Sequence, residues 1–365
     1  MINNNFKFVA FCTSGLEGAV AIELKSLNYK ITYSSSGRIF FTANFDDIPL
    51  LNMKLKSVDR IALLIIEFQA ETFDELYDNV YNSNLKEILE RNAKITIQKV
   101  KVTNSKLSAT GAIASVVKKA ILNNIGGSNE TGPEYPFLII LKDDKAYLLL
   151  DTTGKDGLHK RGYRLKTSKA PLRETIAAGF IILSRWNKDI PLFDPFCGSG
   201  TIPIEAATID IPNVNRTYVS ERWKVLKTTW EKSKIDLRKI NIAKANNSVL
   251  IYASDIDCKN IQIAQENFER AKKVFNVDAK LEFRCIDFKK LEPFYEYSYV
   301  ISNLPYGERL DMDVLTDIKL LREKFTNAKY YLLHPSEKFE KYFGKATKKF
   351  RFQNSGIWTY GYMYY

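Results

Sequence analysis

The stretch Asp194-Pro195-Phe196-Cys197-Gly198-Ser199-Gly200 defines the architecture of the C-terminal half. It follows the apolar run Ile190-Pro191-Leu192-Phe193 and precedes Thr201-Ile202-Pro203-Ile204-Glu205-Ala206-Ala207, which has the composition of a helix start. A strand, a glycine-containing turn and a helix in this order are typical of a doubly wound parallel sheet. Gly198 and Gly200 let the backbone pass close to a ligand, and the helix start offers free amide groups. The stretch therefore predicts an α/β fold with a ligand site at the carboxyl edge of its sheet.

The glycine pattern of this turn separates two classes of ligand. Pro203 stands where the third glycine of the dinucleotide fingerprint G-x-G-x-x-G would be, so the pattern argues against an oxidoreductase that uses NAD. Asp194 could instead pair with the ammonium group of an amino acid-nucleoside such as S-adenosylmethionine. The predicted cofactor contacts in this turn are Asp194, Pro195, Phe196, Cys197, Gly198, Ser199 and Gly200.

Strand and helix patterns alternate from about residue 170 to the end of the chain, which indicates the rest of the sheet. The expected strands are 190–193, 249–253, 281–285, 299–301 and 330–333, with an antiparallel element at 357–364.

Carboxylates follow two of these strands, where a nucleoside would bind. Asp255, with its neighbour Ile256, is predicted to accept the ribose hydroxyls. Asp287, with its neighbour Phe288, is predicted to accept the adenine amino group. Asp255 lies 255 − 200 = 55 residues after Gly200, rather than about 20, so an insertion fills the gap.

The next strand, Tyr299 to Ile301, leads into Asn303-Leu304-Pro305-Tyr306. The amide oxygen of Asn303 and the carbonyl of Leu304 or Pro305 can accept both N–H bonds of an exocyclic amine, and Tyr306 can stack on a base. An ordinary strand-to-turn junction is the alternative for the tetrapeptide alone. These four residues are the catalytic candidates, because the other polar positions of the series point to the same edge of the sheet.

The N-terminal half has a different pattern. Residues 1–57 have the pattern of a small α/β unit, and residues 58–151 form a second unit in which Thr72 and Glu75 make a capping box. A helix stripe ends near Gly126-Gly127, and a hairpin turns at Asp143-Asp144. Residues 152–169 are predicted to be a linker to the C-terminal domain at 170–365.

The net charge of +12 and the pI near 9.2 favour a polyanionic partner. Between Asn92 and Asn129 there are no acidic residues but six lysines, and a second basic group follows Asp151. The predicted nucleic-acid contacts are Lys99, Lys101, Lys106, Lys118, Lys119, Lys160, Arg161 and Arg164.

Several classes are excluded by composition. Two histidines and four dispersed cysteines do not indicate a metal site, a Ser-His-Asp triad or a disulfide framework. Cys197, Cys258 and Cys285 are preceded by residues other than proline, so a cytosine-C5 methyltransferase nucleophile is rejected. The chain has no apolar run near the ~20 residues that span a bilayer, and we expect a cytoplasmic protein that is a monomer or a dimer.

The series from Asp194 to Tyr306 resembles the class I, Rossmann-fold S-adenosylmethionine-dependent methyltransferases that modify exocyclic amines. Residues 58–151 resemble a THUMP RNA-binding domain, preceded by a ferredoxin-like segment. The motifs at 158–164, 170–175 and 303–309 are similar to THUMP-containing guanine-N2-methyltransferases of bacterial large-subunit rRNA. Leu304 departs from that family, which usually has a second proline there, and makes the turn similar to the Asn-Leu/Ile-Pro-Tyr turn of adenine dimethylases of small-subunit rRNA.

The resemblance implies that residues 194–200 hold the methionine part of the cofactor, Asp255 the ribose and Asp287 the adenine. It implies that Asn303 and the next carbonyls orient the target amine. The expected activity is methyl transfer to guanine N2 in 23S rRNA. A tRNA guanine-N2 or adenine-N6 methyltransferase remains the nearest alternative, and a non-enzymatic RNA-binding or ribosome assembly factor is the alternative from another class.

Overall fold

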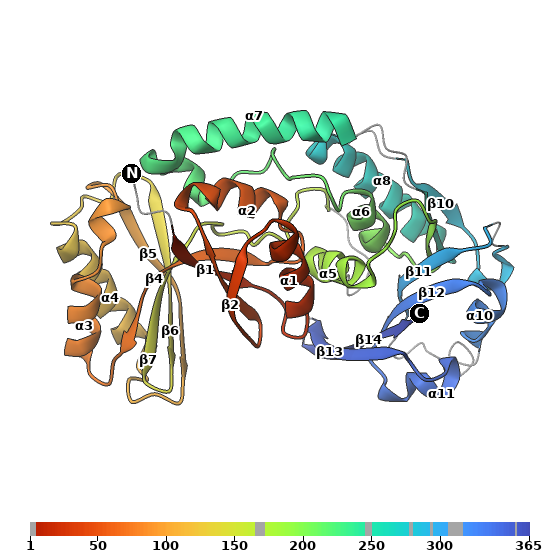
Figure 1. Cartoon of the computed structure of the whole chain (residues 1–365), viewed down its shortest axis with the longest axis horizontal. Helices are drawn as coiled ribbons and strands as arrows, with labels where there is room; N and C mark the ends of the chain where they lie inside the picture. Colours follow the sequence, from red (N-terminus) through yellow and green to blue (C-terminus); the bar gives the residue numbers. More distant parts are fainter. Residues whose placement is uncertain are drawn as a thin grey trace.

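The computed structural model describes residues 5–164, 172–244, 250–276, 280–292, 295–305, 317–354 and 356–365. These residues form two seven-stranded sheets, one in each half of the chain. Figure 1 shows the N-terminal sheet and its helices at one end, the C-terminal sheet at the other, and the long helix α7 running between them.

The N-terminal sheet has the strand order β2-β3-β1-β4-β7-β6-β5. Its strands are β1 (Phe6–Phe11), β2 (Lys30–Ser35), β3 (Arg38–Ala43), β4 (Arg60–Gln69), β5 (Lys94–Thr103), β6 (Glu134–Lys142) and β7 (Lys145–Asp151). Strand β1 pairs antiparallel with β4, with Phe8 opposite Leu63. The two units that the sequence separates therefore share one continuous sheet, because main-chain pairing between β1 and β4 closes the gap between them.

One face of this sheet is covered by α1 (Glu17–Ser26), α2 (Ile48–Lys54), α3 (Phe73–Tyr81) and α4 (Thr110–Asn124). The opposite face has no helix of its own among the described residues, and its centre is a smaller apolar cluster that includes Val9, Leu64 and Leu138.

The local predictions for this half are confirmed. The side chains of Thr72 and Glu75 form a capping box at the start of α3. Helix α4 ends where Gly127 donates its N–H to the carbonyl of Leu122 (2.8 Å). Asp143 and Asp144 both adopt positive φ at the hairpin turn, as a tight β-hairpin requires.

The C-terminal sheet has the order β10-β9-β8-β11-β12-β14-β13. Its strands are β8 (Leu192–Asp194), β9 (Ile251–Asp255), β10 (Glu282–Cys285), β11 (Ser298–Asn303), β12 (Ala328–His334), β13 (Lys348–Asn354) and β14 (Ile357–Tyr364). The first five strands in this order are parallel, and β14 runs antiparallel to both of its neighbours, β12 and β13. The predicted strands are confirmed within a few residues, whereas β13 was not predicted.

The strand order reverses beside β8, where ligands bind in doubly wound folds. From β8 the chain continues to β9 and β10 on one side, and then crosses to β11 on the other. The helices described around this sheet are α5 (Glu174–Ser184), α6 (Thr201–Ala207), α8 (Cys258–Phe275), α10 (Leu320–Lys324) and α11 (Glu340–Phe343).

The insertion before β9 returns to the N-terminal half. Its helix α7 (Lys227–Lys244) begins after Trp223, whose ring stacks on Tyr135 with 4.7 Å between ring centroids. Trp223 also donates its indole N–H to the carbonyl of Glu134 (2.9 Å), and Trp230 is buried in the same N-terminal core. The insertion therefore fastens the two halves together.

The part of the predicted linker that is described, residues 152–164, is packed between the halves, which corrects two of the predicted RNA contacts. Arg161 is 4% exposed, and it donates to Glu205 of α6 and to the carbonyl of Leu158. Arg164 forms an ion pair with Glu174 (3.2 Å) and is also largely buried. Both arginines neutralise carboxylates inside the protein, so neither presents its charge to an RNA.

The expectation for the cysteines was wrong at one pair. Cys258 at the start of α8 and Cys285 at the end of β10 form a disulfide, with 5.1 Å between their Cα atoms. They are 27 residues apart in sequence, and they meet because β9 and β10 are adjacent parallel strands. Cys12 and Cys197 are free and buried.

Candidate active site

Asp194 and Asn303 end the two strands at the point where the strand order reverses. Strands β8 and β11 pair in parallel, with Val300 opposite Phe193. The hydroxyl of Ser302 donates to Oδ1 of Asp194 (2.5 Å), and the backbone N–H of Phe196 donates to the same oxygen (3.3 Å). This contact holds the predicted catalytic turn against the predicted cofactor turn.

The amide of Asn303 has a carbonyl oxygen that is ready to accept. Its Oδ1 atom is buried and has no hydrogen-bond partner among the described residues. Other buried amide oxygens, such as Oδ1 of Asn213, also have no partner among the described residues, so what distinguishes Asn303 is its position at the carboxyl end of β11. Leu304 is buried and anchors the turn by donating its N–H to the carbonyl of Leu333 (3.1 Å), whereas Pro305 is exposed. Tyr306 lies outside the described residues.

The glycine turn at 194–200 is held by contacts with β9 and α8. Gly198 and Gly200 both adopt positive φ, which a residue with a side chain rarely does. The N–H of Gly198 donates to Oδ2 of Asp255 (2.9 Å). The side chain of Asn267, on α8, donates to the carbonyl of Ser199 (3.1 Å). The turn is therefore fixed from two sides before any ligand binds.

The carboxylates of Asp255 and Asp287 both organise their own loops. Asp255 Oδ1 accepts from the N–H of Asp257 (2.9 Å) and from the amide of Asn260 (3.3 Å). Asp287 caps a short 3-10 helix by accepting from the N–H of Lys289 (3.0 Å). A carboxylate oxygen has more than one acceptor site, so these bonds leave room for ligand hydroxyls or amines.

Apolar side chains flank these carboxylates. Ile256 is 72% exposed beside Asp255. Phe288 is buried, and its ring contacts that of Phe196 at 5.0 Å between centroids. The edge therefore combines two carboxylates with an exposed aliphatic side chain and a buried pair of aromatic rings.

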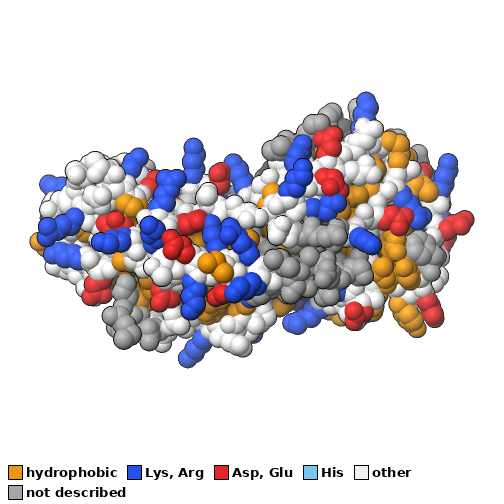
Figure 2. Space-filling view, turned by 90° about the horizontal axis from the view of Figure 1, so that it is seen from above, with side chains coloured by type: hydrophobic (Ala, Val, Ile, Leu, Met, Phe, Trp, Pro, Cys, Tyr) orange, Lys and Arg blue, Asp and Glu red, His pale blue; other side chains and the backbone are white. Residues whose placement is uncertain are grey.

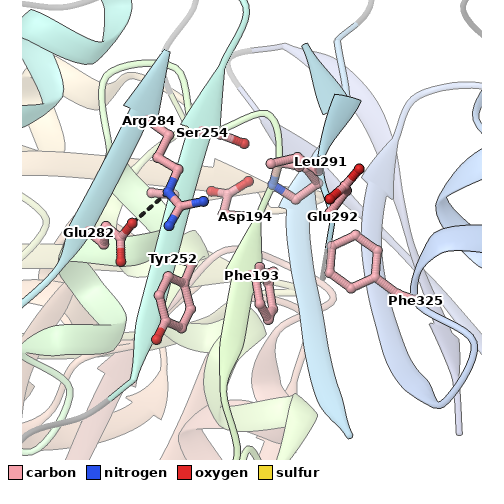
Figure 3. Close-up of a pocket in the computed structure, with 11 residues that line it drawn as sticks. Phe193, Asp194, Tyr252, Ser254, Glu282, Arg284, Leu291, Glu292 and Phe325 are labelled. Atoms are coloured by element: carbon pink, nitrogen blue, oxygen red, sulfur yellow. Dashed lines mark hydrogen bonds and ion pairs between the residues drawn. The ribbon is translucent and has the colours of Figure 1, made fainter. Parts of the chain in front are cut away.

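Figure 3 shows a narrow crevice below this edge, between β9, β8 and the segment containing Leu291. Asp194 and Ser254 lie at its upper end, and the rings of Tyr252, Phe193 and Phe325 lie lower. Arg284, also on its wall, is held by Glu282 (2.5 Å). The lower walls are aromatic and belong to the core under the site.

Burial of the turn favours the protonated, neutral forms of the Asp194 carboxyl and the Cys197 thiol in the free protein. Burial raises the pKa of Asp194 to about 7, and the Asp255 carboxylate adds to the effect, while hydrogen bonds from Ser302 and Phe196 oppose it. Burial, with Asp194 and Asp255 nearby, also raises the pKa of the Cys197 thiol well above its usual value. Cys197 is thus a neutral thiol, not an activated nucleophile.

The predicted RNA-binding lysines divide into two groups. Lys106 pairs with Glu71, and Lys118 pairs with Glu130. Lys99 and Lys101, exposed on β5, have no carboxylate partner among the described residues. Lys119 is exposed on α4, and Lys160 pairs with Asp156 (3.0 Å).

The face of the molecule that carries α7 has charges of both signs. Figure 2 looks down on this face and shows Lys and Arg side chains mixed with Asp and Glu, so the face has no single basic site.

Three supporting residues were not found from the sequence. Ser302, Asn260 and Asn267 hold the site together through side chains that cross between strands, turns and helices. Ser302 could have been suspected, because it directly precedes Asn303 on the strand next to Asp194. Asn260 and Asn267 lie on helix α8, and the residues next to them in sequence form no motif that would indicate a binding site.

The described residues show neither a metal-binding cluster nor a membrane-spanning helix. They contain no group of three or more His, Cys, Asp or Glu side chains placed to hold a metal ion. No helix among them has the length and apolarity needed to cross a membrane.

Three family descriptions match successive parts of the chain. Residues 7–62 match an RlmL ferredoxin-like domain, residues 70–151 a THUMP domain, and residues 161–340 an RMKL-like methyltransferase domain. A Bacillus subtilis (strain 168) protein, described as the "Putative RNA methyltransferase YpsC", is 35% identical over 99% of this chain and 96% of its own.

Relatives with more specific names are less similar. A tRNA (guanine(6)-N2)-methyltransferase of Methanocaldococcus jannaschii is 29% identical and covers 89% of this chain and 87% of its own. A ribosomal RNA large subunit methyltransferase K/L of Cellvibrio japonicus is 29% identical over 96% of this chain, which is 50% of that longer protein.

Two solved structures have the same fold as this protein over almost its whole length. A "possible methylase" from Clostridium difficile 630 superposes with a TM-score of 0.89 at 38% identity, covering 99% of this chain and 98% of its own. SMU.472, described as "a putative methyltransferase complexed with SAH", superposes with a TM-score of 0.86 at 31% identity, covering 100% of this chain and 99% of its own. The chain therefore belongs to the S-adenosylmethionine-dependent RNA methyltransferases that join an RlmL ferredoxin-like domain and a THUMP domain to an RMKL-like methyltransferase domain.

Proposed function

We propose that this protein transfers a methyl group to the exocyclic N2 amine of a guanosine in large-subunit (23S) rRNA. The observation that carries the proposal is the position of Asn303 at the end of β11, next to the strand of Asp194, with a buried Oδ1 that has no partner in the described part of the chain. An amine offers two N–H donors, and this oxygen with a following carbonyl supplies two acceptors. The turn has no group that would act as a strong base, and methyl transfer to an amine does not need one.

The residues at the carboxyl edge fit the cofactor. S-adenosylmethionine, when bound, supplies an electrophilic methyl group on a sulfonium. Asp194 and the 195–200 turn would hold its amino acid part, Asp255 its ribose, and Asp287 its adenine amine. The exposed Ile256 and the buried Phe288 would flank the adenine ring. The pairing of carboxylates with hydroxyls and amines, and of aliphatic surface with a ring, supports this placement.

Asn303 would act by orienting the target amine. The lone pair of the guanine N2 amine is delocalised into the ring. When Asn303 Oδ1 and the Leu304 or Pro305 carbonyl accept its two N–H bonds, the lone pair localises on the nitrogen and the amine becomes nucleophilic. Tyr306 is proposed to stack on the base. The acceleration then comes from positioning and from the fixed dipoles of the turn, and the methylated amine would release one proton to solvent.

A tRNA guanine-N2 methyltransferase is the second candidate, because relatives of that name match most of their own length, whereas the large-subunit relatives match about half of theirs. The two candidates share the chemistry and differ in the RNA.

The deciding experiment offers the purified protein unmodified large-subunit rRNA and, separately, unmodified tRNA with S-adenosylmethionine. Nucleoside mass spectrometry then identifies the product. N2-methylguanosine in rRNA alone supports the proposal, and in tRNA alone it moves the substrate. N6-methyladenosine would contradict the choice of base. Absence of any product, with tight RNA binding, would favour an assembly factor.

Cofactor affinity is expected to depend on pH through Asp194. Its pKa of about 7 in the free protein means that the carboxyl is mostly protonated at pH 6. Only the ionised form pairs with the methionine ammonium, so the affinity should fall about tenfold per pH unit below pH 6 and level off above pH 7. Calorimetry at several pH values measures the profile.

Two variants test this origin. Asp194→Asn should bind weakly and show no dependence over this range. Ser302→Ala removes a hydrogen bond that lowers the pKa of Asp194, so its profile should shift to higher pH. If the affinity of the wild-type protein for S-adenosylmethionine does not change between pH 5.5 and 7, Asp194 does not bind the ammonium group.

The salt dependence of RNA affinity tests the lysines. Lys99→Gln/Lys101→Gln removes two charges without internal partners, and each phosphate contact adds about 0.7–0.9 to the slope of log K against log salt. The double variant should therefore lose about 1.5 from the slope in a filter-binding titration. Lys106→Gln/Lys118→Gln is the control, because these lysines already pair with Glu71 and Glu130. Equal slopes for the first variant and the unaltered protein would exclude Lys99 and Lys101 from the interface.

A further inference from the structure

The turn between β13 and β14 lies at the same edge of the C-terminal sheet as Asn303. In the register, Asn303 is opposite Leu333 of β12, and His334, the next residue, is opposite Tyr360 of β14. Strand β14 runs antiparallel to β12, so the residues before Tyr360 extend beyond the carboxyl end of β12. Trp358 is therefore placed at the carboxyl edge, with one strand between it and the strand of Asn303.

Trp358 is unusual among the tryptophans of this chain. Trp186, Trp223 and Trp230 are 8%, 0% and 1% exposed, whereas Trp358 is 49% exposed. The guanidinium of Arg351, on the neighbouring strand β13, lies 4.3 Å from the Trp358 ring centroid. Arg351 has no carboxylate partner among the described residues, so its charge is not neutralised inside the protein. A flat exposed ring beside a free guanidinium is the chemistry that binds unstacked bases and their phosphates.

The same hairpin touches the N-terminal half. The backbone of Arg351 packs so closely on Gly15 that a Cβ atom at position 15 would collide with the Arg351 carbonyl. Figure 1 shows the β13–β14 hairpin reaching toward α1, which follows Gly15. The hairpin is thus fixed between the catalytic edge and the N-terminal sheet.

A basic hollow of about 390 Å³ begins next to this contact. Ser14, the neighbour of Gly15, lines the hollow, and its hydroxyl is 2.5 Å from that of Ser36, which lines it too. Arg38, Lys99 and Lys101 line the same hollow, and none of them has a carboxylate partner among the described residues. Asp59 also lines the hollow and pairs with Arg173, and the Glu17 carboxylate accepts from the N–H groups of Gly15 and Gly37. Cations without a carboxylate partner among the described residues therefore lie at both ends of the path past Ser14 and Gly15, in the hollow and at Arg351.

We propose that Arg351 and Trp358 form a stacking platform for a base next to the target nucleotide, in a single-stranded RNA segment that runs from the Arg38–Lys99–Lys101 hollow to the catalytic edge. This inference rests on the proposed RNA methylation. A target amine must leave its stack to reach Asn303, and its neighbour then loses a stacking partner. Trp358 replaces that partner, and Arg351 holds the adjoining phosphate. Trp358 is a positioning residue, because it acts on the RNA and not on the reacting atoms.

The kinetic test uses the full chain with the RNA that it methylates. Trp358→Ala should raise KM for RNA about tenfold, in line with the loss of one stacked base, and should leave kcat within about twofold because the chemistry at Asn303 is untouched. Trp358→Phe should restore most of the affinity, since a phenyl ring also stacks. Tyr297→Ala is the matched control, because Tyr297 is 60% exposed just before β11, at the opposite edge of the sheet.

Fluorescence gives a second readout that does not need turnover. Trp358 is the exposed one of the four tryptophans, so a single-stranded oligoribonucleotide of about eight nucleotides should quench its emission. Trp358→Phe should abolish the quenching. An unchanged KM in Trp358→Ala, with no quenching in the unaltered protein, would overturn the platform while leaving the proposed function standing. Failure of the unaltered protein to methylate any RNA, with cofactor bound, would overturn the proposed function and the platform together.

Discussion

Asn303→Ala should lower kcat for RNA methylation by about 10²–10³-fold, the usual cost of removing one preorganised hydrogen-bonding group from a reacting centre. The variant loses the buried acceptor Oδ1, which has no other partner among the described residues. It keeps the cofactor turn, because Ser302 and not Asn303 bonds to Asp194. Cofactor affinity should therefore change by less than about twofold. Single-turnover methyl transfer and calorimetry with S-adenosylmethionine measure the two quantities.

The control for this variant is Asn213→Ala. Asn213 is also a buried amide, and it donates to the carbonyl of Arg161 (3.1 Å) between the two halves. Its loss should reduce stability and leave kcat unchanged. If Asn303→Ala methylates RNA at the wild-type rate, the assignment of the 303–306 turn is wrong.

The second large effect is expected from Glu205→Ala. Glu205 and Arg161 are both buried, and Arg161 donates to Glu205 and to the carbonyls of Leu158 and Lys56. Removing one member leaves a buried guanidinium without its counter-charge, which costs about 3–5 kcal/mol of unfolding free energy. Because Arg161 lies in the segment between the halves and Glu205 lies on α6, the contact between the halves should loosen first. Urea unfolding followed by fluorescence measures the loss.

An exposed ion pair provides the comparison. Asp210 pairs with Lys188 in the same half, and both side chains are more than a third exposed. Asp210→Asn should cost about 0–1 kcal/mol. In the double variant Arg161→Met/Glu205→Met, part of the stability should return because no unpaired charge remains. A loss below about 1 kcal/mol in Glu205→Ala would show that the pair is not a structural contact.

The candidate site was predictable because its signals are local. Turns that need glycine or asparagine, and polar residues at strand ends, are encoded within a few positions of each other. Asp194, Asp255 and Asn303 all lie at the carboxyl edge of one sheet, as their order along the chain predicts. Their roles toward cofactor and base remain predictions.

The contacts that assemble the molecule were not predictable from the sequence. Lys99 and Arg161 belong to similar basic runs, yet one is exposed and the other is buried. The difference depends on Glu205, which is 44 residues from Arg161 in the chain. Cys258 and Cys285 appear isolated in sequence. They pair only because Cys258, at the start of α8, follows β9, and β9 lies beside β10, which ends at Cys285.

Sequence patterns alone predicted the parallel strands of the C-terminal sheet, the glycine turn at 194–200 and the turn that begins at Asn303, because periodicity and turn chemistry act over short distances. The tertiary structure alone decided that β1 and β4 merge two units into one sheet, that α7 reaches back to the N-terminal core, and that Arg161 is internal. The physical reason is that burial and pairing depend on which distant segments meet. A residue's type sets what it can bond to, and only the fold sets which partner is there.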